Sequence, residues 1–134
     1  MSFELRDHTS EVAVEATGDT LDAVFAAVAD GTVAVQCDDV LDAGERFSFS
    51  VEAGSREALL LDFLDRLLYE RDVRSVLPAD HEVAVERGGW RLTASARGVP
   101  LGAVSAREIK APTYSEMVLE ETAAGWHAYV VFDV

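Results

Sequence analysis

The stretch "REALLLDFLDRLLYER", residues 56–71, indicates the fold class of this chain. Its large apolar residues recur every three or four positions, the spacing that gathers side chains on one face of an α-helix. Gly54 and Ser55 precede it as a turn and a helix cap. Leu59 and Leu61 widen the main apolar face, so we expect other elements to pack against more than one side of this helix. That face comprises Leu60, Phe63, Leu64, Leu67 and Leu68.

The sequence before this helix predicts a strand, a helix and a second strand. Residues 12–17, "VAVEAT", and residues 46–53, "RFSFSVEA", alternate apolar and polar side chains, which is typical of strands. Between them Thr20 can cap a helix. Gly31 and the β-branched residues after it are expected to weaken the end of that helix. Its apolar face would comprise Leu21, Val24, Phe25 and Val28.

The sequence after residue 71 predicts a loop and two hairpins. Pro78 and Asp80 indicate the loop. Residues 81–98 form two alternating runs joined at Gly88-Gly89, and residues 117–134 form another pair that turns near 123–125. The last strand is expected to reach Val134. This order predicts an α+β fold: one two-layer domain, residues 1–134, with two amphipathic helices packed on mainly antiparallel sheet.

The charge composition narrows the functions open to the chain. Its 134 residues include 25 Asp plus Glu, ten Arg and one Lys, for a net charge of -14. Acid enrichment with almost no lysine suggests a halophilic source, and a GC-rich genome would also favour Arg over Lys. Broad nucleic-acid binding needs basic patches that are missing from this sequence. A protein partner, a metal ion or a small ligand fits better.

Cysteine content and hydropathy indicate a soluble cytoplasmic protein. Cys37 is the only cysteine, which excludes a disulfide framework and a cysteine-based zinc site. The first residues, "MSFELRDH", are charged and lack the apolar region of a signal peptide. The longest apolar runs are far shorter than a membrane span. We therefore expect no membrane association.

The first candidate segment is "LRDHTSE", residues 5–11. Asp7, His8, Thr9 and Glu11 crowd together just before a predicted strand, where such side chains can line a site. The alternative is a solvated loop in which Asp7 and Thr9 bond their own backbone.

The second candidate segment is the terminal "FDV", residues 132–134. Asp133 should face away from the core and lies next to the terminal carboxylate of Val134. Two carboxylates at one point repel each other unless a cation sits between them. The alternative is a frayed, solvated end.

The third candidate segment is "AREIKAPTYSEM", residues 106–117, which holds the only lysine, Lys110, followed by Thr113 and Tyr114. Lysine is a compact charge suited to an anion or a shared carboxylate. The alternative is an accidental surface lysine, but a freely tolerated lysine should have drifted to arginine in this composition. The three histidines lack zinc-ligand spacing, and phosphate-loop and nucleophile-elbow motifs are missing. His127 is expected to be a surface or packing residue.

Together these segments resemble the archease family along essentially the whole chain. "DHTSE" at 7–11 is similar to the family's D-H-T-A-D signature, and "IKAPTYSEM" at 109–117 is similar to its K-A-x-T-Y-[HS] segment. The terminal "VVFDV" resembles its V-x-x-D-[IVL] ending. The helices at 18–31 and 57–72 also resemble their counterparts in the family.

The resemblance implies an accessory protein, not an enzyme. Archeases serve the RtcB-type RNA ligase of tRNA splicing, speeding its guanylylation and sustaining its turnover. The implied site is a divalent metal ion, Ca²⁺, Mg²⁺ or Mn²⁺, held by Glu11, Asp133 and the carboxylate of Val134, with Lys110 also needed. Asp7, His8, Thr113 and Tyr114 lie in the same motifs. Glu11 replaces the family's usual aspartate, so the ligand type is retained with one more methylene.

Two other functions remain open on the sequence. A small metal-dependent phosphoester hydrolase would use His8 as a base with Glu11 and Asp133 on the metal. A chaperone-like general binding module would use the carboxylate cluster only for structure.

Overall fold

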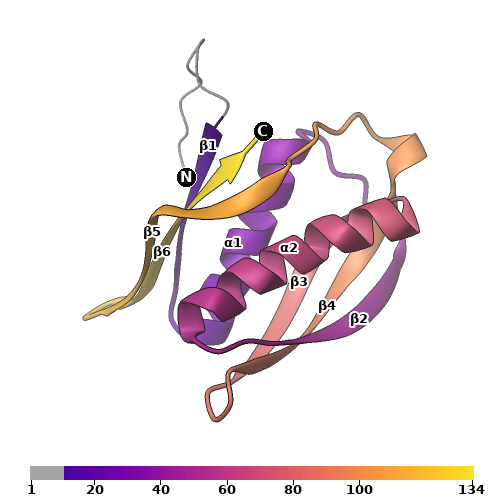
Figure 1. Ribbon diagram of the computed structural model, residues 1–134. Coiled ribbons are helices and arrows are strands. Elements are labelled where there is room, and N and C mark those ends of the chain that lie inside the picture. Colours follow the sequence, from indigo (N-terminus) through magenta and orange to yellow (C-terminus); the bar gives the residue numbers. More distant parts are fainter. Residues whose placement is uncertain (1–10) are drawn as a thin grey trace.

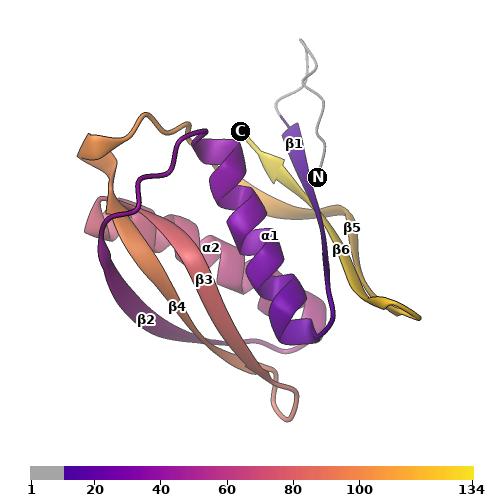
Figure 2. The same ribbon diagram turned by 180° about the vertical axis from the view of Figure 1, so that it is seen from behind.

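The computed structural model describes residues 11–134, which form two helices and two three-stranded antiparallel sheets (Figures 1 and 2). The first sheet has the order β1-β6-β5 and the second the order β2-β4-β3. The predicted α+β class is confirmed. The bounds are β1 (Glu11–Gly18), α1 (Leu21–Gln36), β2 (Glu45–Glu52), α2 (Arg56–Arg74), β3 (Val76–Glu86), β4 (Arg91–Pro100), a 3₁₀ turn η1 (Leu101–Ala103), β5 (Ala111–Thr122) and β6 (Gly125–Asp133).

Both helices pack against both sheets. Figure 2 shows α1 running between β1 of one sheet and β3 of the other. In Figure 1, α2 lies across β3 and β4. Both helices begin at the predicted caps: the Thr20 hydroxyl accepts from the Ala23 amide at 3.1 Å, and the Ser55 hydroxyl accepts from the Ala58 amide at 3.1 Å. No helix in the described part of the chain is long and apolar enough to cross a membrane.

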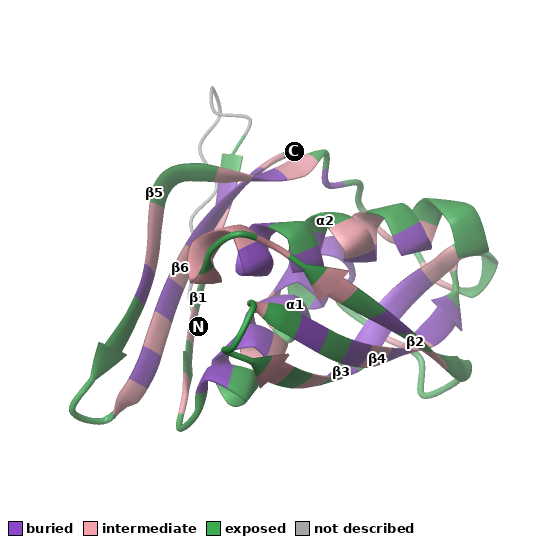
Figure 3. Cartoon of the chain, turned by 60° about the horizontal axis from the view of Figure 1, so that its bottom comes forward, coloured by how far each residue is buried: buried purple, intermediate pink, exposed green. Residues whose placement is uncertain are grey.

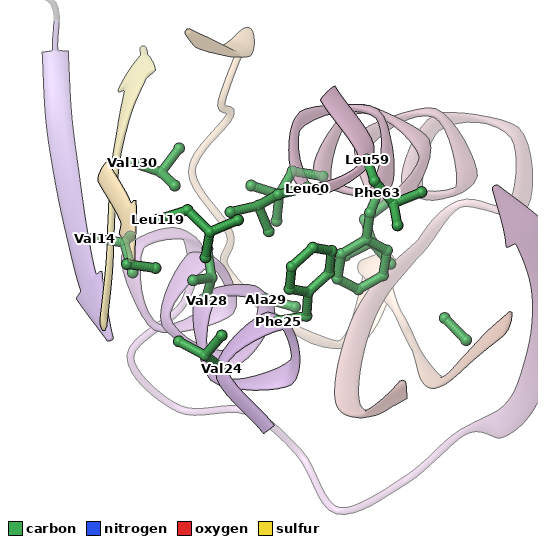
Figure 4. Packing of buried hydrophobic residues seen from close by; sticks show 14 of the residues in the cluster. Val14, Val24, Phe25, Val28, Ala29, Leu59, Leu60, Phe63, Leu119 and Val130 are labelled. Carbon is green, nitrogen blue, oxygen red and sulfur yellow. The ribbon is translucent and has the colours of Figure 1, made fainter. Parts of the chain in front are cut away.

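The core lies where the helices meet the inner faces of both sheets (Figure 3). Figure 4 shows side chains from α1, α2 and the β1-β6-β5 sheet converging there. The Phe25 and Phe63 rings stack with centroids 6.2 Å apart and bring the two helices together. Alternate residues of β6 enter this core, so Phe132 and Val130 are fully buried and Asp133 faces the other way.

Helix α1 does not weaken at Gly31 as the sequence suggested. It continues through Thr32 and Val33 to Gln36, and those three side chains are buried. Burial against neighbouring elements therefore outweighs the poor helix propensity of glycine and β-branched residues. Helix α2 also runs past the expected Arg71 to Arg74.

The predicted loop at Pro78 and Asp80 is wrong, because both residues lie within β3. β3 is an outer strand of its sheet, where a proline without an amide proton can be accommodated. The strand register shifts between Ala79 and Glu82, and Asp80 adopts a φ of 50°. The Arg97 guanidinium donates to the Asp80 carboxylate at 2.7 Å and holds this bulge.

Both predicted hairpins form, with small differences at their ends. β3 and β4 pair on either side of Gly88-Gly89, and β5 pairs with β6. β5 begins at Ala111, earlier than expected, with a register shift between Thr113 and Val118. β6 ends at Asp133, one residue before the expected Val134.

Candidate functional site

Two of the three candidate segments meet through the pairing of β1 with β6. Glu11 lies directly opposite Asp133, at the end of this strand pair. Directly opposite residues of antiparallel strands project to the same face, with their Cβ atoms about 4.5–5.5 Å apart. Because Val12 and Phe132 point into the core, the two carboxylates share the outer face of the sheet. Glu11 is exposed and Asp133 is half-buried.

The third segment joins on the other side of β6. Ala111 lies opposite Asp133 in the β5–β6 pair, and the backbone amide of Lys110 donates to the Asp133 carbonyl at 2.9 Å. The structure thus brings the backbones of Glu11, Lys110 and Asp133 to one corner of the sheet. Glu11 lies far from the other two residues in the sequence. The Lys110 side chain is exposed there.

The remaining predicted residues fall around this corner or outside the described residues. Val134 follows Asp133 and is 39% exposed. Tyr114 is 61% exposed, at the start of the irregular part of β5. Asp7 and His8 lie outside residues 11–134, so their predicted roles stay predictions.

Thr113 has an unusual environment for a polar residue. It lies opposite Val131 on the same outer face as Asp133, two residues along each strand. Its hydroxyl oxygen is buried and has no hydrogen-bond partner in the described structure. A buried polar group without a partner is uncommon and calls for an explanation such as a bound ligand or water.

The donors at this corner suit a hard cation. Glu11 and Asp133 offer carboxylate oxygens, the ligands that Mg²⁺, Ca²⁺ and Mn²⁺ prefer over zinc. Within residues 11–134 no group of three His, Cys, Asp or Glu side chains could hold a metal ion. A cation held by Glu11 and Asp133 would therefore need at least one further donor.

A charge network on the same face was not predicted as such. His127 Nε2 lies 3.1 Å from Glu15 Oε2, and its Nδ1 lies 3.1 Å from Glu120 Oε1, so the histidine links β1, β6 and β5. Hydrogen bonds with Glu15 and Glu120 raise the pKa of His127 above its usual value. All three residues occupy polar positions in strands of alternating apolar and polar residues, and this alternation was the only sign of them in the sequence. Predicting that they contact one another would have required the strand register.

The chain is similar throughout to known proteins of one family. Residues 3–134 match the sequence model of the Archease protein family. The curated "Protein archease" of Methanosarcina mazei is 34% identical over 140 residues, covering 98% of this chain and 95% of the relative. The "Protein archease" of Pyrococcus abyssi is 32% identical, with 98% of each chain covered.

Two solved structures share the fold. The solution structure of Methanobacterium thermoautotrophicum protein 1598 superposes with a TM-score of 0.78 at 28% identity, covering 98% of each chain. The crystal structure of a Thermotoga maritima archease, described as a possible chaperone, has a TM-score of 0.67 at 20% identity and covers 98% of this chain and 96% of its own. The two-sheet arrangement is thus shared with both.

Proposed function

The chain belongs to the archease family, and from this premise we propose that it activates an RtcB-type tRNA-splicing RNA ligase. It would do so as an accessory protein that promotes guanylylation of the ligase and its multiple turnover. The observation that carries the proposal is the meeting of three separate segments at one corner: Glu11 opposite Asp133, with the Lys110 amide bonded to the Asp133 carbonyl.

The proposed site holds one divalent cation. Glu11, Asp133 and the terminal carboxylate of Val134 would be its ligands, and all of these donors are oxygens suited to Mg²⁺, Ca²⁺ or Mn²⁺. When bound, the cation supplies positive charge that offsets the repulsion between these carboxylates. Glu11 in place of aspartate keeps the donor type and lengthens its reach by one methylene.

Lys110 is proposed to act at the edge of this site. Its exposed ammonium group can meet a phosphate or a carboxylate that the partner presents, and lysine offers a compact charge that arginine does not reproduce. Tyr114, exposed four residues further on, would add a contact surface for the same partner.

The net charge of -14 suits a protein partner that itself binds RNA. A ligase that holds tRNA ends needs a basic surface, and opposite charge speeds the encounter of two proteins. The same acidity keeps this chain from competing for the RNA.

Asp7, His8 and Thr113 are proposed to support the site, with the Thr113 hydroxyl facing a ligand or water.

The proposal is tested by adding the protein to its purified cognate ligase with GTP and Mn²⁺. We expect faster ligase guanylylation and more sealed RNA per ligase molecule. No gain in either quantity would refute the function. Hydrolysis of a phosphoester by the protein alone would instead support the metal-dependent hydrolase.

The metal ligands are tested separately by thermal unfolding with and without added Mn²⁺. A cation that binds only the folded state raises the unfolding midpoint. We expect this rise in the wild type and in Glu121→Gln, an exposed strand glutamate outside the site, and its loss in Glu11→Gln. An equal rise in all three proteins would remove Glu11 from the site.

A further inference from the structure

A groove lies at the edge of the β2-β4-β3 sheet, between β2 and the solvent-exposed side of α2. Its volume is about 440 Å³, which exceeds the space of a single ion. It is open to solvent, and its walls are the last three residues of β2 and the exposed side of the middle of α2, so it can accept a short extended segment. Its lining residues are Ser50, Val51, Glu52, Asp62, Asp65, Arg66 and Tyr69.

The groove carries uncompensated negative charge. Arg66 is already paired, since its Nε donates to Glu70 Oε1 at 2.9 Å. Asp62 and Asp65 form no ion pair within residues 11–134, and they lie one helical turn apart on α2. Burial, and after it the charge of Asp62, raises the pKa of Asp65. A positive group in the groove would relieve this repulsion.

The strand that forms the other wall has an open edge. β2 is one of the two outer strands of the β2-β4-β3 sheet and pairs only with β4 in the described structure. An outer strand leaves backbone amide and carbonyl groups available to another extended chain. Tyr69, 57% exposed at the rim, offers apolar surface for the methylene stem of a long basic side chain.

We propose that this groove binds an extended basic segment of a partner protein. The segment adds a strand to the free edge of β2 and places arginine or lysine side chains against Asp62 and Asp65. Backbone pairing supplies affinity and the two carboxylates supply the preference for basic side chains. RNA is disfavoured here because its phosphates would meet the same carboxylates.

The test is an NMR titration of the labelled protein with a synthetic peptide of alternating arginine and threonine. We expect shifts centred on Ser50–Glu52 and Asp62–Tyr69. The double variant Asp62→Asn/Asp65→Asn should weaken binding about tenfold. The matched variant Asp38→Asn/Asp39→Asn, which removes two charges from an exposed bend, should change it by less than about twofold.

Three outcomes would overturn the proposal. Equal weakening in both double variants would mean attraction by net charge alone. Unchanged affinity for a peptide N-methylated at alternate residues would exclude strand addition at β2. Shifts in the groove with Mg²⁺ alone but none with the peptide would make it an ion site. Thermal unfolding of both variants checks that each is folded.

Discussion

At the scale of single residues, His127 links three strands through hydrogen bonds with two glutamates. Its ring lies between Glu15 and Glu120, and their hydrogen bonds raise its pKa. A raised pKa means that the folded state holds the proton more tightly than the unfolded state. The stabilisation is therefore fully present below the unfolded value of about 6.5 and is lost as the pH rises through the higher folded value.

Replacing His127 with glutamine should lower stability in acid more than in base. We expect a loss of about 0.2–1 kcal/mol at a pH below 6.5, because both glutamates are exposed to solvent. The loss should shrink as the pH rises past the folded pKa. Urea unfolding across this range measures it, with Glu121→Gln as the control. A difference that stays constant with pH would contradict the charge network.

The residues of the proposed site could be predicted only in part from the sequence. Lys110 stands out because it is the only lysine, and Asp133 because it faces away from the core of its strand. From the sequence alone, Lys110 could equally be an accidental surface lysine, and Asp133 could lie in a frayed, solvated chain end. What the sequence did not contain was the register that sets Glu11 opposite Asp133. The buried Thr113 hydroxyl likewise depends on tertiary packing that no local pattern encodes.

At the scale of elements, helix starts followed from local chemistry. Thr20 and Ser55 were predicted as caps because a hydroxyl before an apolar-periodic run can accept an amide of the first turn. The ends of elements were less predictable. α1 continues past Gly31 and β3 incorporates Pro78, because burial and strand position outweigh the local preferences of these residues.

The cap of α2 should be worth a measurable share of stability. We expect Ser55→Ala to lower the free energy of unfolding by about 1 kcal/mol, because the Ala58 amide loses its acceptor. Ser50→Ala is the matched control, since Ser50 is an exposed strand serine without a structural side-chain hydrogen bond in the described residues. Urea unfolding of the two variants gives the comparison. Equal effects would mean that the cap contributes nothing.

A buried glutamate holds the C-terminal half of α2. Burial alone would raise the pKa of Glu70, but hydrogen bonds from Arg66 and Arg74 keep it below its usual value. The stabilisation is present above the unfolded pKa and falls away as the pH drops through the folded one. Glu70→Gln should therefore cost more at pH 7 than in acid, by about 1–2 kcal/mol. A cost that does not change between these conditions, measured by urea unfolding, would argue against the ion pairs.

At the scale of the whole molecule, the division into two sheets was not visible in the sequence. Each hairpin is local, but β1 pairs with β6 and β2 with β4 across long stretches of chain. Alternation identifies a strand and not its distant partner.

The net charge of -14 should make stability depend on salt. Raising KCl from about 0.1 M to about 1 M shortens the Debye length from about 10 Å to about 3 Å and screens the repulsion between carboxylates. We expect the thermal unfolding midpoint to rise. The rise should be smaller in Asp38→Asn/Asp39→Asn, which lacks two adjacent charges. A midpoint that is flat or falls with salt would contradict this.

The whole account depends on Glu11, Lys110 and Asp133 acting as one activating site. The most direct measurement is the rate of GTP-dependent guanylylation of the cognate ligase, with wild type and with Lys110→Arg. Arginine keeps the charge but not the compact ammonium group. We predict that Lys110→Arg folds normally and leaves the ligase at its unassisted rate. Full activation by Lys110→Arg would contradict the role assigned to this lysine.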